Sequence, residues 1–222
     1  MSIDWFPLWL SLRVAGLATL ISLGVGLWLA YLLANRQFRG KEVLDAAATL
    51  PLVLPPTVLG YYLLVVVGRE SALGRLYEWL TGGPLVFTWQ AAVVAALFHS
   101  TPLLVKSARA ALESVDRSYE KAARNLGASE WTVFWRVTLP LARRSVFAAT
   151  VLAFARSLGD FGITIMIAGN IPGRTQTLAV AIYDAVESGN GAAARAMVLV
   201  VSAVAVAILW MANRLERRQA AG

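Results

Sequence analysis

The strongest constraint on this chain is its apolar blocks, which extend for about 20 residues or more between polar stretches. A helix rises about 1.5 Å per residue, so such a block crosses a hydrocarbon core about 30 Å thick. Only 15% of the 222 residues are charged, against about 25% in soluble domains. We expect an all-α, polytopic membrane bundle forming a single transmembrane domain over residues 1–222. Five spans are predicted, at about 8–34, 46–68, 86–106, 145–168 and 193–213.

Basic residues gather in alternate connections between these spans. Fourteen of the 20 Lys and Arg residues lie after the first span, between the third and fourth, and in the C-terminal tail. Cytoplasmic loops are enriched in Lys and Arg, so the N-terminus is expected outside and the C-terminus in the cytoplasm. The N-terminus lacks the basic region of a cleaved signal peptide. Topology also accounts for the net charge of +7, without nucleic acid as a partner.

Prolines interrupt two of the predicted spans. The second span contains LPLVLPPTVLGYY, with Pro51, Pro55 and Pro56, and the third contains Pro102. Each proline removes a backbone donor and clashes with the preceding turn, so both helices are expected to kink. Two interpretations stay open: the kinks only improve packing, or the bent helices line a translocation path.

The connection at 113–140 has the pattern of two short helices. Apolar residues occupy one face of the first, at Val115, Tyr119, Ala122, Ala123 and Leu126. Gly127 follows, where a helix end commonly requires positive φ, and Ser129 can cap a second helix. The second helix has its own apolar side, at Trp131, Phe134, Trp135 and Val137. The sequence predicts a compact helical knob on the cytoplasmic face.

The run E-x-A-A-x-x-x-G, followed by F-x-x-V-x-L-P, resembles the EAA loop of ATP-binding-cassette (ABC) importer permeases. The motif residues are Glu120, Ala122, Ala123 and Gly127. Its usual neighbours are matched by Leu126, Ala128, Phe134, Val137, Leu139 and Pro140. The resemblance implies a type I importer permease whose loop inserts into a groove on a separate ATP-binding subunit. Lys121 stands where many members have a second acidic residue, so no charge contact is implied there.

The resemblance covers nearly the whole chain. Four runs are similar to molybdate-importer permeases: LPLVLPPTVLGYYLL (50–64), LESVDRSYEKAARNLGAS (112–129), FARSLGDFG (154–162) and GNIPGRTQTLAVAIY (169–183). This implies a homodimer in a bacterial-type cytoplasmic (inner) membrane, with two ABC ATPase copies and an extracytoplasmic oxyanion-binding protein. ATP and Mg²⁺ would bind the ATPase, because the only Gly-Lys pair, Gly40-Lys41, lacks the upstream glycine of a phosphate-binding loop.

Other functions are weighed against this one. Sulfate/thiosulfate and tungstate permeases carry diluted versions of the same runs and stay open as alternatives. A membrane-embedded enzyme needs a nucleophile with a base, or a metal pair, inside the bilayer. The chain has no Cys, a single His and no G-x-S-x-G elbow, which argues against that class and against a metal site. A scaffold without transport activity would not stimulate a partner ATPase.

Two charged residues fall inside the fourth predicted span. Arg156 and Asp160 are four residues apart, so they are expected to share a helical face near the membrane midplane. Charge is costly there and faces the bundle interior or water. We favour a structural pair that neutralises itself, and the alternative is an anion contact on the translocation path. His99, the only histidine, is assigned no role.

The external segment 175–188 has the pattern of an amphipathic helix. Its apolar positions repeat at helical spacing, at Leu178, Ala181, Ile182, Ala185 and Val186. The segment is too short to span, so it predicts an interfacial helix at the outer mouth. A docking surface for the binding protein, an outer gate and a passive lid are the interpretations left open.

Overall fold

The structure, a computed structural model, describes the backbone of residues 4–220 and the side chains of residues 4–210. Four helices are long: α1 (Phe6–Asn35), α5 (Trp89–Glu113), α8 (Leu139–Leu158) and α11 (Gly191–Ala220). The first half adds α2 (Lys41–Thr49), the 3₁₀ turn η1 (Leu50–Leu52), α3 (Pro56–Val67) and α4 (Ala72–Thr81). The second half adds α6 (Arg117–Asn125), α7 (Glu130–Val133), the π-helical turn η2 (Phe134–Thr138), α9 (Gly162–Ile167) and α10 (Leu178–Glu187).

Four helices are long and apolar enough to cross a membrane, and a bent pair of helices gives up to five spans. No strand occurs in the described part of the chain, so the expected all-α, polytopic class is confirmed. The first, third and last predicted spans correspond to α1, α5 and α11. Side chains at 211–213, and those of the basic tail beyond, lie outside the described residues.

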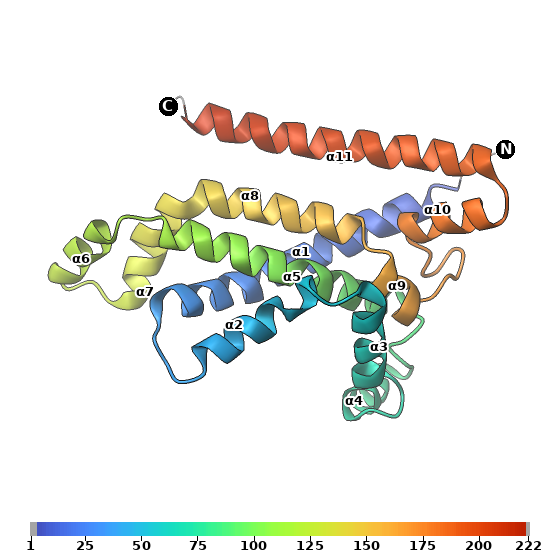
Figure 1. The fold of residues 1–222 in the computed structure, drawn as a ribbon, viewed down its shortest axis with the longest axis horizontal. Helices are drawn as coiled ribbons and strands as arrows, with labels where there is room; N and C mark the ends of the chain where they lie inside the picture. Colours follow the sequence, from blue (N-terminus) through green and yellow to red (C-terminus); the bar gives the residue numbers. More distant parts are fainter. Residues whose placement is uncertain (1–3, 221–222) are drawn as a thin grey trace.

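The second span is not the single kinked helix expected at 46–68. Segments Lys41–Leu52 and Pro56–Val67 meet at 114°. Pro51 lies in η1, Pro55 precedes α3 and Pro56 opens it. Consecutive prolines cannot donate to the preceding turn, so the first helix ends and a new one starts in another direction. In Figure 1, α3 runs across the direction of the long helices.

The fourth span also differs from the continuous helix expected at 145–168. Helical structure runs from Glu130 to Leu158 and stops, and α9 begins only at Gly162. Gly159 ends α8 with φ −92° and ψ 9°, outside helical geometry. Glycine loses more conformational entropy on entering a helix than other residues do, so a glycine at this position favours a break. In contrast, α5 continues through Pro102 as one helix.

The two broken spans pack on each other through glycine. A Cβ at Gly60 of α3 would lie 2.7 Å from Met166 Cβ, and one at Gly162 would lie 2.6 Å from Pro56 Cβ. Both distances are shorter than carbon–carbon contact allows. Only glycine therefore lets α3 and α9 approach this closely, and interruptions far apart in the sequence meet in space.

The core of the bundle is formed by α1, α5 and α8, which lie side by side in Figure 1. Their contacts use small residues, since Ala15, Ala18, Ala95 and Ala108 are fully buried. Small side chains let helix backbones approach closely in lipid, where hydrophobic attraction between helices is weak. By contrast, α11 packs mainly on α10 and leaves most of its length uncovered by this chain.

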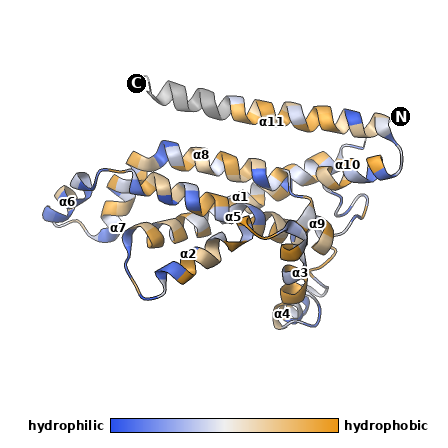
Figure 2. Ribbon diagram, viewed as in Figure 1, coloured by the Kyte–Doolittle hydropathy of each residue, from blue (hydrophilic) through white to orange (hydrophobic). Residues whose placement is uncertain are grey.

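The polar parts gather at the ends of the bundle. Figure 2 shows hydrophilic residues on α6 and on the turn between α1 and α2, at the end where the C-terminus also lies. The N-terminus, α10 and the start of α5 lie at the opposite end. These two ends are called the loop end and the outer end below.

Candidate coupling loop and intramembrane site

The predicted loop contains two short helices joined at Gly127. Asp116 caps α6 by accepting a hydrogen bond from the Ser118 backbone N–H at 2.8 Å. Gly127 has φ +84°, and its N–H donates to the Arg124 carbonyl at 2.9 Å. Ser129 caps α7 by accepting from the Thr132 backbone N–H at 3.3 Å. The positive φ and the serine cap expected from the sequence are confirmed.

Glu120 is the structural centre of this loop. Its side chain is buried, with Oε1 accepting from the Thr138 hydroxyl at 2.7 Å and Oε2 accepting from Arg124 Nη2 at 3.3 Å. Arg124 also donates to Glu130 Oε1 at 2.7 Å, and this hydrogen bond raises the pKa of Arg124. Thr138 ends η2, directly before α8. One carboxylate therefore ties α6 to the base of the fourth span.

The apolar face predicted for the first helix is largely uncovered. Leu126 is 89% exposed, Tyr119 is 57% exposed and Trp131 on α7 is 70% exposed. Phe134 instead points inward, and its ring centroid lies 4.6 Å from that of Tyr31 on α1. Large exposed apolar side chains on a polar surface are typical of a protein interface. We call Tyr119, Leu126 and Trp131 the docking patch.

The remaining motif residues form the base of the loop. Leu139 packs against the buried cluster shared by α1, α5 and α8, whereas Pro140 is exposed in the first turn of α8. The π turn η2 ends at Thr138, two residues before Pro140. Because a proline removes a donor and crowds the preceding turn, a widened turn accommodates it without ending the helix. Ala122 is exposed, and three others are half-buried: Ala123, Ala128 and Val137.

Asp160 occupies the break in the fourth span. Its side chain is buried, and Oδ2 accepts from the Thr164 backbone N–H at 3.1 Å and from the Thr164 hydroxyl at 2.5 Å. Its other oxygen, Oδ1, has no hydrogen-bond partner among the described residues and lies 3.9 Å from His99 Nδ1. The carboxylate therefore starts α9 and faces α5.

The expected pairing of Arg156 with Asp160 is wrong. Because α8 ends at Leu158, the two residues do not share one helical face. Arg156 is exposed, Asp160 is buried, and no ion pair joins them in the part of the chain that the structure describes. His99, for which no role is predicted from the sequence, is the group facing Asp160 instead. It lies about 15 Å along α5 from its first residue, which places the contact well inside the span.

Two substitutions separate the hydrogen bonds of Asp160 from its charge. Asp160→Ala leaves the Thr164 donors unpaired, so we expect it to destabilise the protein by about 1–3 kcal/mol. Asp160→Asn keeps an accepting oxygen and is expected to retain most of the stability. The midpoint of thermal unfolding of the purified protein measures both. Equal losses in the two variants would show that the charge, rather than the hydrogen bonds, stabilises the break.

The external segment forms α10, as a short helix at the outer end. Its buried face, Leu178, Ala181 and Ala185, packs on Ala194 and Met197 of α11. The Leu178 backbone N–H donates to Ser11 Oγ at 2.7 Å, which links this helix to α1. The helix is therefore held on both sides by the outer ends of two spans.

Comparisons with known proteins agree with this fold. A family model described as "Binding-protein-dependent transport system inner membrane component" matches residues 22–221. The molybdenum transport system permease protein ModB of Escherichia coli (strain K12) is 46% identical over 98% of this chain and 96% of its own. The putative molybdenum transport system permease protein YvgM of Bacillus subtilis (strain 168) is 41% identical over 92% of this chain and 90% of its own.

A solved structure shares the architecture at much lower identity. The MetNI methionine ABC transporter, in an inward facing conformation, superposes with a TM-score of 0.76 and 17% identity, over 96% of this chain and 94% of that chain. The helices of this chain are thus arranged as in a chain of an ABC transporter. The chain belongs to the binding-protein-dependent transport system inner membrane component family, and is a multi-pass permease of the inner membrane.

Proposed function

We propose that two copies of this chain form the translocation path of a molybdate importer, and that each docks one ATPase subunit through residues 113–140. The observation that carries the docking is the docking patch, exposed on a loop that Glu120 fastens to the fourth span. An exposed patch without this attachment would bind a partner but transmit no force. ATP and Mg²⁺ belong to the partner in this proposal.

The contacts suggest how motion passes from the ATPase to the membrane. Movement of α6 is carried to Thr138 by the buried Glu120, and so to the continuous helix that ends at Leu158. Beyond the break, α9 packs on α3 through Gly60 and Gly162. A rigid helix coupled to two broken spans can rock while the breaks absorb the change in direction. The substrate path then opens alternately on the two sides.

The substrate is inferred from the relatives, which are molybdenum transport permeases in name. An extracytoplasmic binding protein delivering a tetrahedral oxyanion fits the family to which the chain belongs. The alternative from another class, a membrane-embedded enzyme, would need a nucleophile with a base, or a metal pair, inside the bilayer.

Reconstitution tests the proposal. The permease, its ATPase and the binding protein are placed in liposomes, and ATP-dependent uptake is compared for molybdate, tungstate and sulfate. We expect molybdate with the binding protein to stimulate both hydrolysis and uptake. Stimulation by sulfate alone would overturn the substrate, and hydrolysis that never responds to the permease would overturn the docking. A version without the binding protein is the control for basal hydrolysis.

A further inference from the structure

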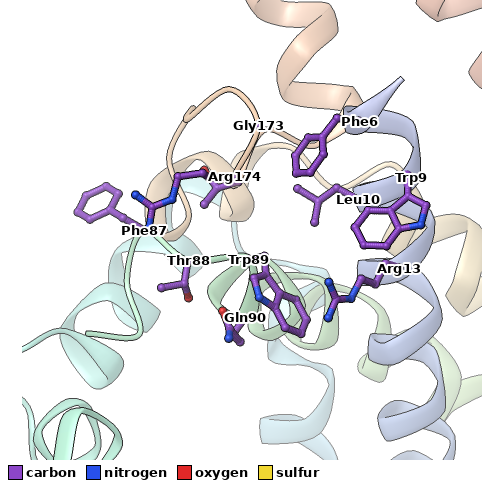
Figure 3. A pocket seen from close by; sticks show the side chains of 11 residues that line it. Phe6, Trp9, Leu10, Arg13, Phe87, Thr88, Trp89, Gln90, Gly173 and Arg174 are labelled. Atoms are coloured by element: carbon purple, nitrogen blue, oxygen red, sulfur yellow. The ribbon is translucent and has the colours of Figure 1, made fainter. Parts of the chain in front are cut away.

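A cavity of about 440 Å³ opens at the outer end and has no assigned role. Three segments line it: the first turns of α1, the start of α5 and the loop before α10 (Figure 3). Arg13 and Arg174 stand on opposite sides of this cavity, and the Arg13 guanidinium reaches toward Trp89. Two arginines from segments far apart in sequence thus border one cavity, and the Arg174 side chain extends toward Phe87. Hereafter this is the outer cavity.

The positive charge of the outer cavity is not compensated. None of its lining residues is acidic. Among the described side chains, Arg69, Arg109 and Arg124 all pair with carboxylates, whereas neither Arg13 nor Arg174 does. Two like charges bordering one cavity repel each other and attract an anion. The outer cavity therefore favours a negatively charged ligand.

Arg13 is held in a position that leaves its donors free. Its guanidinium carbon lies 3.9 Å from the ring centroid of Trp89 and 5.2 Å from that of Trp9. Stacking on an aromatic face uses the face of the guanidinium and not the N–H groups in its plane. Those N–H groups match the paired oxygens of a phosphate or a similar oxyanion. The indoles thus orient Arg13 without satisfying it.

Arg174 stands on a loop that is fixed by its own hydrogen bonds. The Ile171 carbonyl accepts from the backbone N–H groups of Arg174, Thr175 and Gln176 at 2.9–3.2 Å. The Gln176 amide donates to Asn170, and Asn170 donates to Asp184 on α10. A loop tied this closely presents its cation at a defined place, which lowers the ordering cost of binding.

We propose that the outer cavity binds a tetrahedral oxyanion group, with Arg13 and Arg174 as its charged ligands. The group is either the free substrate anion arriving from outside or the phosphate of an anionic phospholipid at the membrane surface. Both present the same oxygens to the same guanidinium groups. The inference rests on the proposed function only for the identity of the free anion.

Binding to the full-length permease in nanodiscs tests the site. Radiolabelled molybdate and sulfate are titrated in phosphatidylcholine discs, and retention of phosphatidylglycerol is measured by native mass spectrometry in a second arm. Arg174→Gln is the principal variant, because its exposed side chain makes no hydrogen bond or ion pair among the described residues. Losing one charged hydrogen-bonding ligand is expected to weaken binding by about tenfold or more. Arg13→Gln should do the same, with its unfolding midpoint measured alongside.

Arg75→Gln is the matched control. Arg75 lies on α4, is exposed, and does not line the outer cavity, so the substitution removes the same charge elsewhere. Anion binding that is weakened by Arg174→Gln but not by Arg75→Gln supports the site. The experimental arm in which binding weakens identifies the source of the anion, free or lipid-borne. Sulfate binding without molybdate binding would support the site while refuting the proposed substrate. The proposal is overturned if no anion binding is detected in either arm, or if Arg13→Gln and Arg174→Gln both bind anions like the wild type.

Discussion

The Gly127→Pro variant is expected to insert and assemble normally, but the amount of substrate taken up per ATP hydrolysed is expected to fall at least about tenfold. Gly127 has φ +84° and donates its N–H to Arg124. Proline fixes φ near −65° and has no N–H, so the turn between α6 and α7 cannot keep its shape. The docking patch spans this turn, with Leu126 on one side and Trp131 on the other. Its two halves would then no longer fit one groove.

Gly189→Pro is the matched control for this turn. Gly189 has φ +73°, donates its N–H to Val186 at 3.1 Å, and has open space where a Cβ would lie, as Gly127 does. Proline at this position therefore removes the same N–H and the same positive φ, but at the outer end, away from the docking patch. We expect the control to keep ATPase stimulation by the permease. Uptake and phosphate release in liposomes measure both variants, and normal coupling in Gly127→Pro would refute the role of the loop.

Glu120→Ala is expected to have the second largest effect. The substitution removes the acceptor of the buried Thr138 hydroxyl and one of the two carboxylates that Arg124 contacts. A buried hydroxyl left unpaired costs about 1–3 kcal/mol, which shifts a local equilibrium by roughly fivefold to 150-fold. The loop would then detach from η2 while the docking patch remained. The ATPase would still bind, but its movement would reach α8 weakly.

Two variants test whether the buried contact is responsible. Glu120→Gln keeps an oxygen that can accept from Thr138, so it should recover most of the coupling. Glu130→Ala removes an exposed partner of Arg124, and exposed ion pairs contribute only about 0–1 kcal/mol. Its coupling should stay close to that of the wild type. Measurements of ATPase binding and of uptake per ATP decide the matter: weak binding with normal coupling in Glu120→Ala would contradict the proposed linkage.

The sequence predicted the features that depend on local chemistry. Apolar length and the positions of Lys and Arg are properties of the chain itself, so the membrane bundle and the knob at 113–140 were predictable. The positive φ at Gly127 and the cap at Ser129 also depend on a few neighbouring residues. Glu120 was identified through its motif, but nothing in the sequence says that its partner is Thr138.

The tertiary structure decided where the spans break and which charges meet. The hydropathy pattern does not reveal the break, because α8, Asp160 and α9 together contain enough apolar residues for one continuous helix. Helical spacing then paired Arg156 with Asp160, whereas the chain turns after Leu158 and brings Asp160 against His99 of α5. A signal was available in Gly159 and Gly162, which disfavour a helix on either side of Asp160.

The outer cavity shows the same division between chain and fold. Arg13, Trp89 and Arg174 are far apart in the sequence, and each alone is an ordinary residue near the end of a span. The sequence by itself determined a multi-pass helical bundle with a helical knob at 113–140, because burial in lipid and turn geometry act over one helix or one turn. Only the folded bundle decided the Asp160–His99 contact, the packing of α3 on α9 and the placing of Arg13 and Arg174 at one cavity. Those depend on how helices pack side by side, where single glycines set the distance of approach.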